Sequence, residues 1–109
     1  MQFNEVDGRL LLRRDAEEKQ PLLSRLSRIE GQVRGLRQMV ESDRHCGEVL
    51  QQTAAITSAL REVTLLCIED NIEAGIHNAV QVRRNGADAR SEEAGAAEMV
   101  RLLRAALKQ

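Results

Sequence analysis

The chain has 109 residues, of which 42% are hydrophobic and 30% are charged, and its formal net charge is -1 at pH 7. This length predicts one domain, and the two cysteines are too few for a disulfide framework. Because Phe3 is the only aromatic residue, aliphatic side chains have to form the core, which favours packed helices over a β-sandwich. We find no secretory signal pattern and no apolar run near the roughly 18 residues of a membrane span, so we expect a protein of the reducing cytoplasm.

Residues 1–20 mix charges with a short apolar group, and we predict a mobile arm there with room for one loose turn of helix. Pro21 suits the first turn of a helix, where its missing N–H costs nothing. From that point apolar residues recur at helical spacings of three and four, namely Leu22, Leu26, Ile29, Val33, Leu36 and Val40. We therefore divide the chain into an arm, 1–20, and a single helical domain, 21–109.

A long helix is predicted from Cys46 to Val80, after Ser42 and Asp43 end the first helix and offer capping oxygens to the second. One apolar stripe contains Cys46, Val49, Thr53, Ile56, Leu60, Val63 and Cys67. A second stripe, on a different face, contains Leu65, Ile68, Ile72, Ile76 and Ala79. Two stripes need two packing partners, and a helix of roughly 50 Å is longer than such a domain is wide. We therefore expect a second subunit to bury part of it.

A turn is predicted at Asn85-Gly86, before a shorter helix. Ser91 and the two acids that follow it are typical of a helix start. Val100, Leu103 and Leu107 give this last helix its apolar edge. The predicted order is arm, helix, long helix, short helix.

The first helix carries four arginines against one acid, Glu30; they are Arg25, Arg28, Arg34 and Arg37. The planar guanidinium suits phosphate oxygens, and Gln32 could add a neutral donor. Either these residues bind nucleic acid, or they form an ordinary solvated helix face.

Cys46 stands in the first turn of the long helix, after Arg44 and His45. A helix start and a neighbouring cation favour a reactive thiolate, although Cys46 could also be a plain member of the apolar stripe. Cys67, in mid-helix, is predicted to be a core residue, and His77 is a lone histidine. No CxxC, HExxH or glycine-rich phosphate loop is present, so we do not expect an enzyme.

The stretch RLSRIEGQVRGLRQMVESDRHCGEVLQQTAAITSALREVTLLCIEDNI resembles the CsoR/RcnR family of bacterial transcriptional repressors. The resemblance covers Leu22 to about Val80 and includes the RxxRIxGQVRG pattern and the cysteine after a short loop. It implies an all-α fold with a three-helix protomer, whose long second helices pair antiparallel in a dimer, and dimers that assemble into a dimer of dimers. It also implies binding to operator DNA, and release when an effector reaches a cysteine-centred site between subunits of the homodimer or homotetramer.

By position, the resemblance assigns DNA contacts to Arg25, Arg28, Gln32, Arg34 and, on the long helix, Arg61. Cys46 matches the sensing cysteine of the family. Copper sensors place a histidine at the position of Asn71 and a cysteine at that of Gly75, which together with the first cysteine hold Cu(I), whereas nickel and cobalt sensors place histidines at both. This chain keeps only Cys46 of these ligands, with His45 beside it.

Because the usual metal ligands are missing at Asn71 and Gly75, we favour thiol-based sensing at Cys46, with reactive sulfur, an oxidant or an electrophile as the effector. Persulfide sensors of the family also lack the histidine, although they keep a cysteine at the position of Gly75. Formaldehyde-responsive members pair the first cysteine with an N-terminal amine. One alternative is a divergent site for copper or another transition metal, with Cys46 as a metal ligand together with His45 or His77. The other is a helical scaffold that neither senses nor binds DNA.

Overall fold

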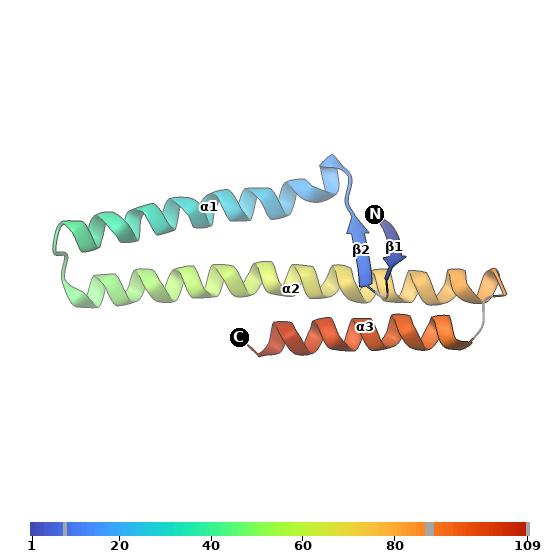
Figure 1. Ribbon diagram of the computed structural model, residues 1–109. Coiled ribbons are helices and arrows are strands. Elements are labelled where there is room, and N and C mark those ends of the chain that lie inside the picture. The colour runs from blue at the N-terminus through green and yellow to red at the C-terminus, as the bar shows by residue number, and fades with distance from the viewer. Residues whose placement is uncertain (8, 87–88, 109) are drawn as a thin grey trace. The chain divides into compact units, whose positions relative to one another are not determined.

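The computed structural model describes residues 1–7, 9–86 and 89–108. These contain a pair of strands, β1 (Gln2–Val6) and β2 (Arg9–Arg13), and three helices, α1 (Ala16–Glu41), α2 (Cys46–Arg84) and α3 (Ala89–Leu107) (Figure 1). The three helices, with a long second one, confirm the predicted all-α protomer. The chain forms two compact units. We call Glu17–Leu66 the helical-hairpin unit, and Met1–Ala16 with Cys67–Gln109 the terminal unit.

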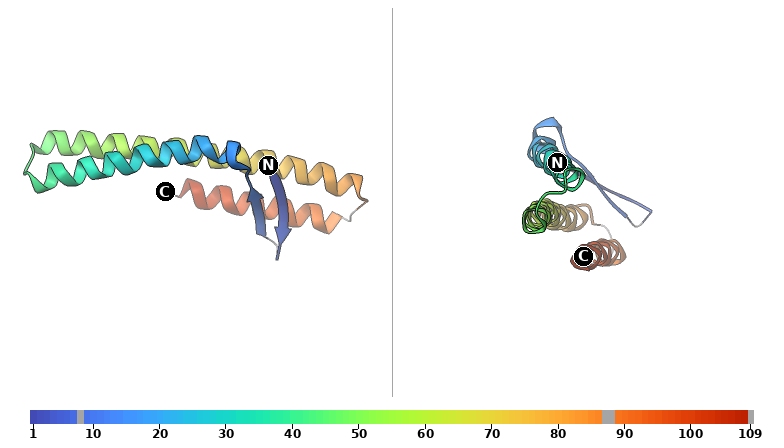
Figure 2. Two further views of the ribbon diagram at one scale, coloured as in Figure 1. Left: turned by 90° about the horizontal axis from the view of Figure 1, so that it is seen from above. Right: turned by 90° about the vertical axis from the view of Figure 1, so that its left-hand side faces the viewer.

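In the helical-hairpin unit, α1 and the first part of α2 run antiparallel, side by side (Figures 1 and 2). Ile29 of α1 and Ile56 of α2 are its buried apolar side chains. The Gln52 side chain of α2 donates a hydrogen bond from Nε2 to the backbone oxygen of Gln32, at 3.0 Å. The apolar core of this unit is therefore thin, and a polar contact between the helices supplements it.

The face that α2 buries in this unit differs in part from the predicted stripe. Its less exposed side chains are Val49, Gln52, Ile56, Ala59, Val63, Thr64 and Leu66. Thr53 and Leu60 are exposed instead. Gln52 replaces Thr53 because the Gln32 carbonyl satisfies its amide, while the Thr53 hydroxyl donates to the carbonyl of Val49 in its own helix, at 2.9 Å.

The N-terminal residues differ from the predicted loose turn of helix. β1 and β2 pair antiparallel, with Val6 opposite Arg9. Asp7 has a φ of 53°, and an Asp-Gly pair is a strong hairpin-turn sequence because such turns need positive φ. The mobility of an arm at 1–20 stays a prediction.

α1 begins at Ala16, five residues before the predicted start at Pro21. Asp15 precedes the helix, and Glu17 and Glu18 lie in its first turn, where negative charge is favourable. Pro21 lies inside α1 and removes one backbone donor there.

In the terminal unit, α3 runs beside the second part of α2 (Figure 2), and β2 contacts α3. Ala74 is buried in the unit, and so is Glu98, which accepts two hydrogen bonds from Arg101 at 2.6 and 2.7 Å. These hydrogen bonds and the negative charge of Glu98 raise the pKa of Arg101 above its usual value. No helix among the described residues offers a stretch long and apolar enough for a bilayer crossing.

The predicted turn at Asn85-Gly86 is confirmed. Gly86 has a φ of 66°, a left-handed conformation that glycine adopts without strain, and its N–H donates to the Arg83 carbonyl at 3.2 Å. α3 begins at Ala89, two residues before the predicted Ser91, whose side chain lies outside the described part of the chain.

The hairpin is tied to α2 by an ion pair, because Arg14 Nε donates to Asp70 Oδ2 at 2.8 Å and both side chains are mostly buried. We expect Arg14→Ala to lower the free energy of unfolding by about 1 kcal/mol or less and to speed amide exchange in β1 and β2. Arg13→Ala, which removes the neighbouring exposed arginine, is the control. Equal exchange rates in the two variants would show that the ion pair does not hold the hairpin.

Candidate functional site

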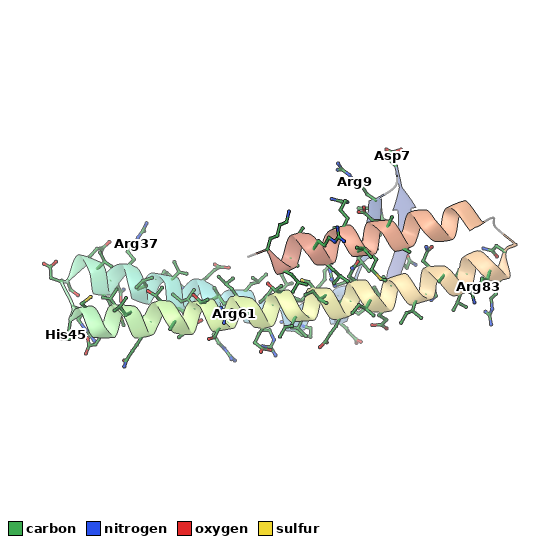
Figure 3. The ribbon with its side chains drawn as sticks, turned by 90° about the horizontal axis from the view of Figure 1, so that it is seen from below. Asp7, Arg9, Arg37, His45, Arg61 and Arg83 are labelled. Carbon is green, nitrogen blue, oxygen red and sulfur yellow. The ribbon has the colours of Figure 1, made fainter. Side chains whose placement is uncertain are left out.

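Cys46 is the first residue of α2, and its thiol is free and exposed. The residue before it, His45, caps the helix, because His45 Nδ1 accepts a hydrogen bond from the Gly47 backbone N–H at 3.1 Å. His45 lies in the loop between α1 and α2, at one end of the helical-hairpin unit (Figure 3), directly before Cys46. The structure thus places an accessible sulfur at a helix start, as predicted.

The predicted cap by Ser42 or Asp43 is wrong. Ser42 Oγ donates to the Gln38 carbonyl at 2.8 Å and so closes the end of α1, and Asp43 turns the chain with a φ of 55°. His45 follows that turn directly and is the residue placed to reach the first amides of α2. Because its Nδ1 accepts the capping bond, Nε2 is the nitrogen that remains for any other ligand.

The positive charge of Arg44, two residues before Cys46, is paired with a carboxylate. Arg44 Nε donates to Glu48 Oε2 at 2.8 Å, in an i,i+4 ion pair with both side chains about half-exposed. The carboxylate therefore offsets the cation that precedes Cys46.

Asn71 and Gly75 lie one helical turn apart in the terminal unit. Asn71 is 6% exposed, and within the described residues its Nδ2 and Oδ1 have no hydrogen-bond partner. At Gly75 an added Cβ would overlap the Met99 sulfur of α3, and at Gly95 it would come within 2.9 Å of the Asn78 amide nitrogen. The two glycines thus allow side chains of α2 and α3 to pack directly on the opposite backbone.

A small cavity of about 200 Å³ lies between α2 and α3, with Gly75, Gly95 and Met99 in its wall. The sequence pattern placed Met99 only beside the apolar edge of its helix. The signal that could have found it is Gly75, because a glycine inside a long helix usually has a packing reason.

Cys46 belongs to the helical-hairpin unit, whereas Asn71 and Gly75 belong to the terminal unit. Over residues 1–7, 9–86 and 89–108, no three His, Cys, Asp or Glu side chains gather as a metal site. Cys67 is exposed, so its predicted core position is wrong, and His77 is exposed as well. A common site of Cys46, Asn71 and Gly75 stays a prediction.

The arginines predicted to contact DNA are all exposed; they are Arg25, Arg28 and Arg34 on α1 and Arg61 on α2. The remaining arginine of the basic stretch, Arg37, is exposed as well, and Figure 3 labels Arg37 and Arg61. An α-helix turns about 100° per residue, so Arg28 lies about 60° around α1 from Arg25, but Arg34 lies on the opposite side. The arginines of α1 are thus spread around the helix, and one straight phosphate backbone cannot contact all of them.

Gln32 lies between the helices. Its side chain is half-buried, and its Oε1 has no hydrogen-bond partner among the described residues. Its backbone carbonyl accepts the bond from Gln52. A DNA contact by Gln32 therefore stays a prediction, since its side chain would have to turn outward to make one.

Comparison with known proteins finds similarity over most of the chain. Residues 18–107 match the family model of a metal-sensitive transcriptional repressor. The chain is 42% identical over 88 residues to the copper-sensing transcriptional repressor RicR of Mycobacterium tuberculosis, covering 81% of this chain and 91% of that protein. It is 38% identical over 75 residues to the copper-sensing transcriptional repressor CsoR of Bacillus subtilis, covering 69% and 74%.

Two solved structures also match the chain. The copper-sensing repressor CsoR with Cu(I) from Geobacillus thermodenitrificans matches with a TM-score of 0.72 at 34% identity, over 91% of this chain and 96% of that one. The nickel-responsive transcriptional regulator InrS matches with a TM-score of 0.68 at 37% identity, over 80% and 90%. Residues 1–17, which include the hairpin, lie outside the matched family model.

Proposed function

Because the chain belongs to the metal-sensitive transcriptional repressor family, we propose that it binds operator DNA and leaves it when Cu(I) reaches a site centred on Cys46. The relatives are repressors, which bears out the expectation that the chain is not an enzyme. The observation that carries the proposal is the exposed thiol of Cys46 at the start of α2, in a chain 42% identical to a copper-sensing repressor.

We prefer Cu(I) to thiol modification as the signal that releases DNA, although the sequence alone favoured thiol modification. Two relatives and one matched structure are copper sensors. Cu(I) prefers soft sulfur ligands, and the Cys46 thiolate is one. Asn71 offers a carboxamide, which is a poor ligand for Cu(I), and Gly75 offers no side chain. Cys46 is therefore a suitable ligand for Cu(I). Because Asn71 and Gly75 are not, the site requires a further soft donor from another residue.

The site draws on two chains. Cys46 and Asn71 are 25 positions apart in α2, and a helix rises about 1.5 Å per residue, so they are roughly 37 Å apart along its axis. A second copy that packs antiparallel along α2 brings the start of one α2 toward the middle of the other. This agrees with the apolar side chains that α2 leaves exposed, among them Leu60, Ile72 and Ile76.

Thiol modification is the second candidate function, and the exposure of Cys46 is the observation that favours it. A persulfide or an electrophile needs one accessible thiolate and no further ligand. The two inputs differ in their need for metal. Release of DNA that persists in a Cu(I) chelator would favour modification over copper.

The function is tested by titrating the protein against a labelled DNA fragment from upstream of its own gene, with fluorescence anisotropy as the readout. Binding without metal and release on addition of Cu(I) are the expected results. A protein that binds this DNA no better than an unrelated fragment would be a helical scaffold, and one that binds but ignores Cu(I) would not be a copper sensor.

Exposed arginines of α1 are the proposed DNA contacts, and because Arg25 and Arg34 lie on opposite sides of the helix, they would contact different phosphates. We expect Arg25→Ala and Arg34→Ala each to weaken binding to every DNA sequence, and to lower the slope of log K against log salt by about 0.9 for each phosphate that the variant no longer neutralises. Titrations at several salt concentrations measure this. Arg104→Ala, which removes an exposed arginine of α3, is the control, and an equal slope in all three variants would remove α1 from the DNA surface.

A further inference from the structure

The thioether of Met99 lies directly on the backbone of α2. A Cβ built at Gly75 would overlap Met99 Sδ, and it would lie 3.6 and 3.7 Å from the Met99 Cε and Cγ atoms. Met99 is half-buried and lines the 200 Å³ cavity between α2 and α3 together with Gly75. A soft sulfur therefore occupies the space that a side chain of residue 75 would fill.

Asn71 gives an independent indication that this part of α2 meets a partner. It precedes Gly75 by one helical turn, so the two positions lie on neighbouring parts of one face. The Asn71 side chain is 94% buried, since 6% of it is exposed, yet neither Oδ1 nor Nδ2 is hydrogen-bonded within the described residues. Buried amides are costly without partners, which points to a group from outside the single chain.

We propose that Met99 Sδ is a Cu(I) ligand of this protein, together with the thiolate of Cys46 from a second chain. This inference rests on the proposed function. Thioether and thiolate sulfur are the donors that select Cu(I) over harder metals. Cys46 releases its thiol proton to solvent on binding, Met99 donates a lone pair without losing a proton, and copper remains in the +1 state. The buried Asn71 amide supplies a hydrogen bond that orients the coordinated sulfur.

Gly75 has a defined part in this site. Any side chain at residue 75 would displace the Met99 sulfur from α2, because its Cβ and the sulfur would overlap. Because residue 75 is glycine, α2 supplies no ligand at this position. The Met99 sulfur of α3 reaches the same place instead. The competing interpretation is that Met99 is only a packing residue, and it predicts that a leucine of similar volume would serve as well.

The decisive experiment compares Cu(I) affinities of the full-length protein, measured without oxygen in competition with a chromophoric Cu(I) chelator. Met99→Leu is expected to weaken Cu(I) binding by about tenfold or more, since about tenfold is the lower end of the loss seen when even a residue that only supports a metal ligand is changed. X-ray absorption of the copper complex should show one sulfur fewer, with thermal stability and assembly unchanged. Met39→Leu, at a half-buried methionine of α1, is the matched control and should bind as the wild type does.

Two variants at residue 75 extend the test. Gly75→Ala should weaken Cu(I) binding because its methyl group displaces the Met99 sulfur. Gly75→Cys combined with Met99→Ala should restore both affinity and sulfur count, since a thiolate then fills the vacated place. This restoration would not follow if Met99 had only a packing role.

The outcomes separate the inference from the function on which it rests. If Met99→Leu keeps the affinity and sulfur count of the wild type, the Met99 ligand is excluded while copper sensing stands. A loss of binding in Cys67→Ala with none in Met99→Leu would likewise exclude Met99 and move the second sulfur to the other exposed thiol. If the wild type binds Cu(I) no more tightly than Cys46→Ala does, copper sensing and the Met99 ligand fail together.

Discussion

Cys46→Ala is expected to bind operator DNA as the wild type does and to remain bound at every Cu(I) concentration. The substitution should leave the fold intact, because Cys46 is exposed at the first residue of α2 and its side chain supports no core. It removes the ligand on which the proposed site is centred. In the wild type, Cu(I) is expected to lower DNA affinity by about 5- to 150-fold, the usual range of coupling between two sites. In Cys46→Ala this ratio should fall to one.

Anisotropy titrations with and without Cu(I) measure the ratio directly. Cys67→Ala is the matched control, because Cys67 is also a free, exposed thiol on α2. It should respond to copper almost as the wild type does. A Cys46→Ala protein that still leaves DNA when Cu(I) is added would place the sensing site elsewhere.

The same variant separates the two candidate inputs. A persulfide donor or an aldehyde, added with a strong Cu(I) chelator, should leave the wild-type complex with DNA intact if copper is the effector. Release under those conditions, and its loss in Cys46→Ala, would put thiol modification first.

The sequence predicted the helices well because their signals are local. The spacing of Leu22, Ile29 and Leu36 defines α1 within a few residues, and Asn85-Gly86 ends the long pattern of α2. Helix starts were less predictable. Pro21 is typical of a first helical turn, whereas α1 begins five residues earlier, at the acids of its actual first turn. The strands of the hairpin are short, and the Asp7-Gly8 pair between them was the signal that went unused.

The candidate site likewise has one part that the sequence predicts and one part that it does not. Cys46 could be placed at a helix start because only the preceding loop decides this. The position of Met99 against Gly75 could not be predicted, since it depends on the rotation of α3 about its axis and on its height along α2. The capping bond of His45 is by contrast local, since it joins residues two positions apart next to the left-handed turn at Asp43. Residues that act through contacts distant in sequence thus remain hidden until the packing of the helices is known.

The second large effect is expected at the surface between chains. The described buried apolar side chains of one chain are few, namely Ile29, Ile56 and Ala74. Leu60 is 47% exposed on α2, and Ile76 is 61% exposed on the same helix. A chain of this size with so little buried apolar surface gains stability by association, so a second copy is expected to cover these side chains.

Leu60→Asp would place a carboxylate in that contact, where it has neither water nor a partner. Burying an unpaired charge costs several kcal/mol, so the variant should dissociate into monomers or unfold. Light scattering gives the mass, and circular dichroism separates dissociation from unfolding. Ser58→Asp adds the same charge at an exposed polar position on the opposite side of α2, and it should keep the wild-type mass. If the wild type is a well-folded monomer at micromolar concentration, or if Leu60→Asp keeps the mass of the wild type, α2 does not form the interface, and Cys46 of one chain cannot reach Met99 of another by this route.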